Sequence, residues 1–105
     1  LIVGSGFTTH NLRWFNPAGG PDVAPPSASS EFDHWAAECM DAGDLDALLD
    51  FERRAPAARV AHPRTEHWAP LYVALAAAAA SGPLDTEVAV DGFWYGLSTR
   101  SWQLN

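Results

Sequence analysis

The chain opens with a short apolar run, Leu1–Val3, which stops at the glycine-rich stretch Gly4–Gly6. An apolar run that stops at glycine is typical of a buried strand leading into a tight loop. Residues 16–30 then follow, rich in Pro, Gly, Ser and Ala and without any hydrophobic period. This composition predicts a surface loop, and long loops of this kind often border functional sites.

The first predicted helix follows this loop. Apolar side chains recur at helical spacing from Phe32 to Met40, which places them on one helix face. Ser29 or Ser30 can cap the start of the helix, and Gly43 is expected to end it.

Two further helices are expected before the end of the chain. Asp44 can cap a second, shorter helix, and residues 55–64, with two prolines, are expected to be connecting chain. A third helix is predicted from Thr65 through the alanines to the Gly-Pro stop after Ser81. Pro70 is tolerated only near the start of that helix, where its missing N–H costs little.

The last residues predict strands. Residues 86–90 alternate between polar and apolar side chains, Asp91-Gly92 is a turn signal, and residues 93–103 form one or two further strands. The order strand, three helices, closing strands predicts an α/β domain with layers of sheet and helix. Because the chain already begins inside a predicted strand, we expect residues 1–105 to be the C-terminal part of a single domain.

The charge balance limits the possible partners. Six basic and thirteen acidic residues give a formal net charge of −7, which disfavours nucleic acid and anionic membrane surfaces as partners. The longest apolar run, Trp68 to Ala80, contains Pro70 and is shorter than the ~20 residues that span a bilayer. Cys39 is the single cysteine, so no internal disulfide can form, and a reducing, cytoplasmic location is expected.

Two histidines are candidates for chemistry. His10 follows the first predicted strand, and ligands of open α/β sheets collect at the carboxyl ends of strands. The alternative is a loop histidine bonded to backbone. His67 lies near the start of the third helix, where the positive potential of unpaired N–H groups disfavours the imidazolium ion. A neutral imidazole there is suited to bind a metal or to transfer protons.

The neighbouring residues are weaker candidates. His62 precedes Pro63, which favours extended backbone, and it could reach the same cleft as His67. Glu66 is better explained by stabilisation of the helix dipole than by metal ligation. The sequence lacks a Cys-x-x-Cys pair for structural zinc, and Thr9 stands where a dinucleotide-binding loop requires glycine.

Three segments resemble one known family. Gly4–Gly6 followed by His10–Arg13, the stretch His62–Leu71 and the tail Gly96–Gln103 closely resemble the class III extradiol ring-cleavage dioxygenases. Within that family they are most similar to the 4,5-DOPA dioxygenase type. The segments occur in the family's order and spacing and span nearly the whole chain.

The resemblance implies a non-haem metal centre, with Fe(II) for turnover and Zn(II) possible in the same site. It implies that residues 1–105 are the C-terminal part of one catalytic domain, whose missing N-terminal part supplies two more histidines. His67 is then a metal ligand. His10 matches a position described either as a further ligand or as the catalytic acid–base group. We favour the acid–base role, because four histidines around the metal would leave less room for catechol and O2.

The function implied by the resemblance is O2-dependent ring opening of catechols such as DOPA to a muconate semialdehyde. Arg13 and His62 are expected to orient the substrate. Without the N-terminal part, the 105 residues are expected neither to hold iron well nor to cleave catechols. The alternative is a non-catalytic or truncated relative that acts as a binding or partner module. A hydrolase is disfavoured, because the sequence has no Gly-x-Ser-x-Gly nucleophile motif.

Overall fold

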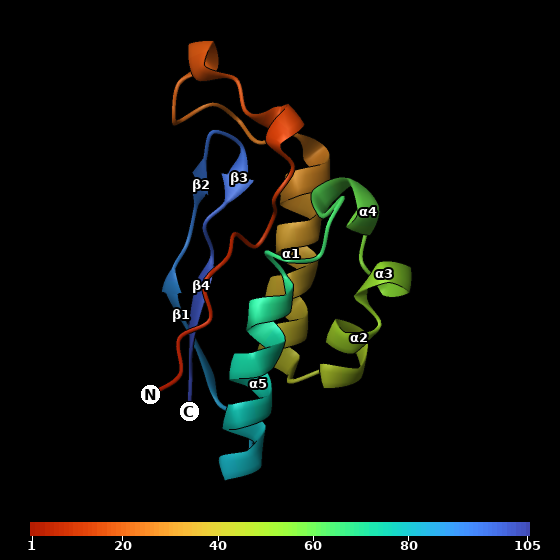
Figure 1. The fold of residues 1–105 in the computed structure, drawn as a ribbon, viewed down its shortest axis with the longest axis vertical. Coiled ribbons are helices and arrows are strands. Elements are labelled where there is room, and N and C mark those ends of the chain that lie inside the picture. The colour runs from red at the N-terminus through yellow and green to blue at the C-terminus, as the bar shows by residue number, and fades with distance from the viewer.

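Helices and strands lie on opposite sides of the molecule in the computed structural model, which describes all 105 residues (Figure 1). This confirms the predicted mixed α/β class. The elements, in chain order, are η1 (Leu12–Trp14), η2 (Pro17–Gly19), α1 (Ser27–Ala42), α2 (Leu45–Leu49), α3 (Phe51–Arg54), α4 (Ala58–Ala61), α5 (Ala69–Ser81), β1 (Thr86–Val90), β2 (Phe93–Trp94), β3 (Leu97–Ser98) and β4 (Ser101–Leu104).

Helix α1 confirms the predicted apolar face but begins earlier than expected. It starts at Ser27 directly after Pro26, so Ser29 lies inside the helix and does not cap it. Proline fixes its own φ near the helical value and favours an extended conformation in the residue before it, which sets a helix boundary without a side-chain cap. The helix ends as predicted at Gly43, which adopts the left-handed conformation with a φ of 63°.

The middle helices are shorter and more numerous than the pattern predicted. Asp44 caps α2 as expected, since its carboxylate accepts a hydrogen bond of 3.0 Å from the backbone N–H of Ala47. Residues 55–64 are not plain connecting chain, because α4 forms within them. Ala58 and Ala61 are buried in the core, and this tertiary burial stabilises one helical turn that has no extended apolar pattern of its own.

Helix α5 begins at Ala69, later than the predicted start at Thr65. Residues 65–68 form a turn, in which the N–H groups of Trp68 and Ala69 both donate to the carbonyl of Thr65. Pro70 occupies the first turn of the helix, where a backbone N–H would have no intrahelical hydrogen-bond acceptor. His67 therefore lies in the turn before the helix and not in its first turn.

The strands form two small antiparallel pairs. Strand β1 pairs with β4, with an irregularity between Val88 and Val90, and β2 pairs with β3. The two residues between β2 and β3, Tyr95 and Gly96, have φ angles of 50° and 79°. Two positive φ angles in a two-residue hairpin loop define a type I′ turn, whose twist matches that of the flanking strands.

The predicted opening strand, Leu1–Val3, is not formed. The first backbone hydrogen bond of the chain is donated by Thr8, and the three apolar side chains are exposed. A strand is stabilised by hydrogen bonds to a neighbouring strand, and β1 and β4 pair only with each other. The segment instead runs beside β4 toward the upper half of the molecule (Figure 1).

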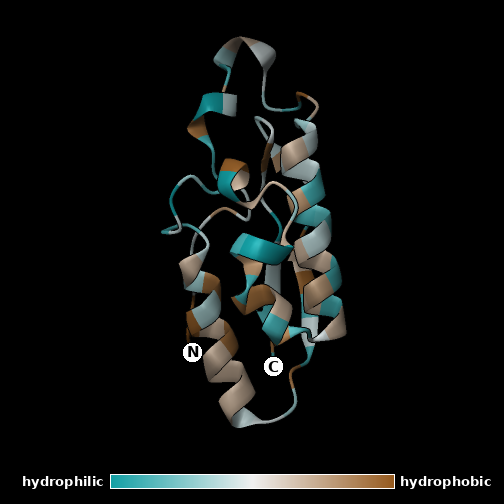
Figure 2. Ribbon diagram, turned by 90° about the vertical axis from the view of Figure 1, so that its right-hand side faces the viewer, coloured by the Kyte–Doolittle hydropathy of each residue, from teal (hydrophilic) through white to brown (hydrophobic).

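The core lies between α1, the short helices and the first half of α5. Figure 2 shows that hydrophilic and hydrophobic residues alternate along α1, whereas α5 is apolar for most of its length. No helix combines the length and apolar character needed to cross a bilayer. The main cluster of buried apolar residues consists of Phe32, Ala36, Cys39, Met40, Ala47, Leu48, Phe51, Ala55, Ala58, Ala61, Trp68 and Leu75.

A buried ion pair connects α1 to the strands. Asp33, 4 % exposed, accepts two hydrogen bonds from the Arg100 guanidinium, at 2.9 and 2.8 Å, and a third from the Ser98 hydroxyl at 2.5 Å. Paired donors on both carboxylate oxygens give this contact a defined geometry. It fixes the β3–β4 region against α1 and thereby supports the segment that carries His10.

Candidate functional site

The segment that carries His10 is held by backbone contacts on both sides. The N–H of Thr8 donates to the carbonyl of Ser98 at 3.2 Å, and the Thr8 hydroxyl donates to the carbonyl of Arg100 at 2.8 Å. On the other side, the N–H of His10 donates to the carbonyl of Ala61 at 2.9 Å. The loop therefore lies between the strands and α4, and its position does not depend on a regular element of its own.

Buried polar side chains extend this attachment. The Thr9 hydroxyl lies 2.8 Å from the hydroxyl of Ser29 in α1 and accepts a hydrogen bond of 2.8 Å from the N–H of Ser98. Asn11 donates to the carbonyl of Val60 at 2.8 Å. Buried polar groups are costly when unpaired, so these bonds define one loop conformation. The structural roles of Thr9 and Asn11 could not be predicted from local sequence, because their partners are far away in the chain.

His67 is positioned by the residue that follows it and by a glycine of the opening segment. Trp68 is 1 % exposed, and its indole N–H donates to the hydroxyl of Tyr72 at 2.7 Å, which anchors the turn. A Cβ on Gly6 would collide with the carbonyl oxygen of His67. Gly4 similarly passes so close to Pro70 that a Cβ would lie 2.5 Å from its carbonyl oxygen. The two glycines therefore allow the backbone of the opening segment to lie directly against residues 67–70.

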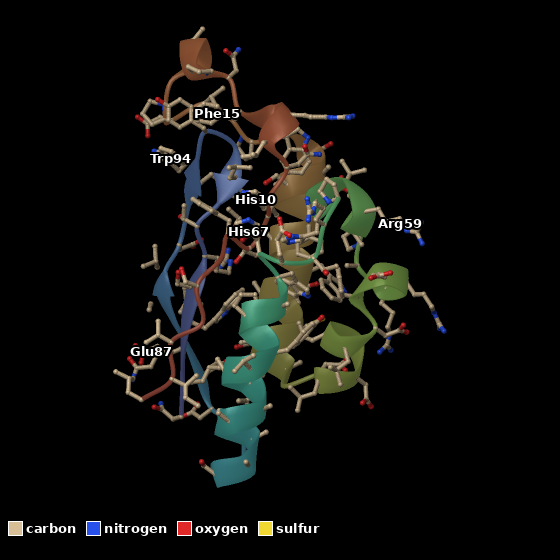
Figure 3. The ribbon with its side chains drawn as sticks, viewed as in Figure 1. His10, Phe15, Arg59, His67, Glu87 and Trp94 are labelled. Atoms are coloured by element: carbon tan, nitrogen blue, oxygen red, sulfur yellow. The ribbon has the colours of Figure 1, made fainter.

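The rings of His10 and His67 lie against each other (Figure 3). Their centroids are 3.5 Å apart and their planes differ by 13°, and both residues are half-buried. Burial lowers the pKa of His10, and the neighbouring His67 imidazole lowers it further. A ring that stays neutral near pH 7 keeps a nitrogen lone pair available for a metal ion or a proton.

His62 lies deeper than the sequence suggested. It is 4 % exposed, packs against Phe32 and Trp68, and makes a hydrogen bond of 2.7 Å from Nε2 to the carbonyl of Thr8. Its Nδ1 is buried without a hydrogen-bond partner. Burial lowers the pKa of His62 to about 4, so the ring is neutral near pH 7. The ring has no solvent-facing edge for a substrate, and it supports the loop from behind.

The remaining predicted residues lie at the surface. Arg13 is exposed on η1, and its backbone N–H donates to Asn11 at 3.0 Å. Its guanidinium forms no ion pair. Glu66 is exposed and pairs with Arg64 at 3.3 Å. Neither side chain is part of the His10–His67 contact.

The donors present fit a metal ion in type but not in number. Imidazole nitrogens suit iron, zinc and other transition metals. No group of three or more His, Cys, Asp or Glu side chains lies close enough together to hold an ion. His10 and His67 can therefore supply only part of a coordination sphere.

A groove of about 840 Å³ borders His67. The opening segment, α5 and β4 form its walls, and both apolar and polar side chains line it. Phe7 also lines this groove and belongs to a group of aromatic side chains that were not predicted from the sequence. Phe7 has its ring centroid 6.3 Å from that of His10 and 6.2 Å from that of Trp94.

Comparison with known proteins found curated relatives but no matching family model. The chain is 38 % identical over 78 residues to "4,5-DOPA dioxygenase extradiol" of Beta vulgaris, and 38 % identical over 78 residues to the protein of the same name from Mirabilis jalapa. It is 34 % identical over 82 residues to that of Portulaca grandiflora. These matches cover 73 to 74 % of the chain but only 28 % of each relative's length. The resemblance to extradiol dioxygenases is therefore confirmed. It applies to a chain that spans only about 28 % of the length of each relative.

Proposed function

We propose that this chain supplies part of the catalytic centre of a metal-dependent extradiol dioxygenase, which opens the ring of catechols such as DOPA. The observation that carries the proposal is the stacked contact between the His10 and His67 rings. These two imidazoles come from segments far apart in the chain, and each is held by its own backbone contacts. Curated relatives named as 4,5-DOPA dioxygenases support the same reaction class.

In this proposal His67 is a ligand of Fe(II), with Zn(II) as an alternative ion in the same position. The bound metal supplies a site at which a catechol diolate and O2 are held next to each other. The further ligands come from the part of the protein that corresponds to the unmatched length of the relatives. This requirement follows from the two donors present, which are fewer than such a centre needs.

His10 acts as the acid–base group in this proposal. Its ring makes no hydrogen bond with another side chain, so a ring nitrogen is free to accept the proton of a catechol hydroxyl. The same imidazole nitrogen then returns a proton to the substrate as the catechol ring opens. Both atoms of O2 end in the product, a muconate semialdehyde. Arg13, which is exposed and unpaired, is available to bind an anionic group of the substrate.

A chimera tests these roles. The chain replaces the segment that it matches in the Beta vulgaris relative, and O2 uptake with DOPA and Fe(II) is recorded together with the bound metal. We expect His67→Ala to abolish metal binding. We expect His10→Gln to retain the metal and lower O2 uptake about 10²- to 10⁴-fold, the usual range for a general acid–base group. His34→Gln, at an exposed histidine of α1, is the matched control and leaves both unchanged.

The alternative is a non-catalytic binding module, which the incomplete donor set favours. In that case the chimera shows no DOPA-dependent O2 uptake, and His67→Ala changes neither its O2 uptake nor its bound metal. The 105 residues alone are expected to show no O2 uptake. Turnover by the chain alone at the rate of the chimera would contradict the need for further ligands.

A further inference from the structure

We infer that Phe7, Phe15, Trp94 and Tyr95 form an aromatic platform that binds the ring of the substrate beside the histidine pair. The inference rests on the proposed function, and it assigns a substrate-binding role to residues outside the pair. The platform favours planar aromatic diols over aliphatic diols of the same size.

The four side chains form a continuous series that starts at His10. The ring of Phe7 lies 6.2 Å from that of Trp94, and their planes are within 16° of parallel. Phe15 lies 6.0 Å from Trp94 and 4.6 Å from Tyr95, and the Trp94 and Tyr95 rings meet edge to face at 4.7 Å. Figure 3 shows Phe15 and Trp94 close together at the same end of the molecule, beyond His10.

The platform is separate from the core and open to solvent. The other large aromatic cluster, which includes Phe32, Phe51 and Trp68, is buried in the core. By contrast, Trp94 is 46 % exposed and Phe15 is 38 % exposed. Large aromatic side chains gain most from burial, so a group of them that stays exposed next to candidate catalytic groups indicates a binding surface.

Backbone contacts keep the platform in place. Tyr95 adopts a φ of 50°, which is unfavourable for a residue with a bulky side chain. Its N–H donates to the carbonyl of Pro21 at 3.0 Å, so the long loop after η2 holds the turn. A Cβ on Gly96 would lie 3.1 Å from Cδ of Pro26, which shows how closely the same loop approaches the turn. The segment from Pro21 to Pro26 thus lies directly against the turn that carries Tyr95.

The position of Phe7 connects the platform to the chemistry. Its ring has neighbours on two sides, with His10 at 6.3 Å and Trp94 at 6.2 Å. A catechol ring stacked on this surface lies within reach of His10 through its hydroxyl groups. Aromatic pairs contribute about 0.5–1.5 kcal/mol beyond their burial, equivalent to a change in Kd of about 2- to 13-fold. A cyclic aliphatic diol has the hydroxyls but cannot stack.

The test measures binding to the metal-free protein, so that it does not depend on turnover. Catechol and trans-1,2-cyclohexanediol are titrated, and Kd values are obtained by ligand-observed NMR. We expect Trp94→Leu to raise the Kd for catechol about 3- to 10-fold and Trp94→Phe to restore most of the affinity. Leu49→Ala, which truncates an exposed apolar side chain on α2, is the control and leaves the Kd unchanged. Phe15→Leu is the second variant, and circular dichroism verifies that each variant is folded.

The inference is overturned if Trp94→Leu and Phe15→Leu both bind catechol as tightly as the wild type, or if cyclohexanediol binds as tightly as catechol. This outcome is distinct from failure of the proposed function. In the chimera, Trp94→Leu is expected to raise KM for DOPA while kcat stays within about twofold. If neither the chimera nor any of its variants takes up O2, but catechol binding still depends on Trp94, the proposed dioxygenase function is rejected and the proposed aromatic platform is retained.

Discussion

The buried ring of His62 predicts a loss of stability on mild acidification. Its hydrogen bond to the Thr8 carbonyl requires a proton on Nε2, and Nδ1 faces no donor or acceptor. A second proton on Nδ1 would therefore place an unpaired charge between Phe32 and Trp68. Burial is the main reason that the pKa falls from 6.5 to about 4 in the folded chain.

The magnitude follows from this difference. Above pH 6.5 the ring is neutral in the folded and unfolded states, so it contributes no pH dependence. Below pH 6.5 the unfolded chain takes up a proton that the folded chain does not bind until about pH 4. Each pH unit in this window removes about 1.4 kcal/mol from the free energy of unfolding. The loss is about 2 kcal/mol at pH 5 and about 3 kcal/mol at pH 4.

Urea unfolding of the wild type and His62→Gln at pH 7.5 and pH 5.0 measures this effect. Glutamine retains a donor for the Thr8 carbonyl but does not titrate, and carboxylates common to both proteins cancel in the difference. We expect the stability of the wild type relative to His62→Gln to fall by about 2 kcal/mol between the two pH values. The stability of the wild type relative to His34→Gln, at a largely exposed histidine, should not fall in this way. An equal pH dependence for the wild type and His62→Gln would refute the reasoning.

Two further changes test the attachment of the loop. Asp33→Asn is expected to lower the free energy of unfolding by about 3 kcal/mol, because Arg100 loses its buried carboxylate partner. Asp91 is a 65 % exposed partner of the same guanidinium, so Asp91→Asn is expected to lower the free energy of unfolding by less than about 1 kcal/mol. Gly6→Ala is expected to cost about 1–3 kcal/mol in urea unfolding, because the added methyl group meets the carbonyl of His67.

The control for the glycine substitution is Gly19→Ala, where the added methyl group would meet only the Val23 side chain, at 3.4 Å. An equal cost at both glycines would show that the approach of Gly6 to the turn is not tight. Equal costs for Asp33→Asn and Asp91→Asn would show that burial does not determine the strength of the ion pair.

Much of the fold could be predicted from local patterns. The apolar face of α1, its end at Gly43 and the cap at Asp44 depend on neighbouring residues, so the sequence alone contains the signal. The segment Leu1–Val3 was predicted wrongly, because a strand needs a partner and hydrophobicity does not reveal one. The start of α5 was also misplaced, because the turn after Thr65 is fixed by its contacts with the opening segment.

The site was predictable only where a motif marked it. The proximity of His10 and His67 followed from the family resemblance, and no periodicity indicated it. The burial of His62 depends on Phe32 and Trp68 packing around it from two other helical regions, which no local pattern encodes. The aromatic platform could not be predicted for the same reason, because Phe7 and Phe15 meet Trp94 and Tyr95 only after the chain has folded.

The bonds that attach Thr8 and Thr9 to the strands join segments that are synthesised at very different times. Thr8 and Thr9 reach their final positions through bonds to Ser98 and Arg100, close to the other end of the chain. Translation proceeds from the N-terminus, so His10 emerges long before these partners exist. Closing so long a loop is entropically costly and comes late in folding. A nascent chain therefore lacks the bonds that attach Thr8 and Thr9 to the strands until β3 has formed, whereas the bond from His10 to Ala61 needs only residues that are synthesised earlier.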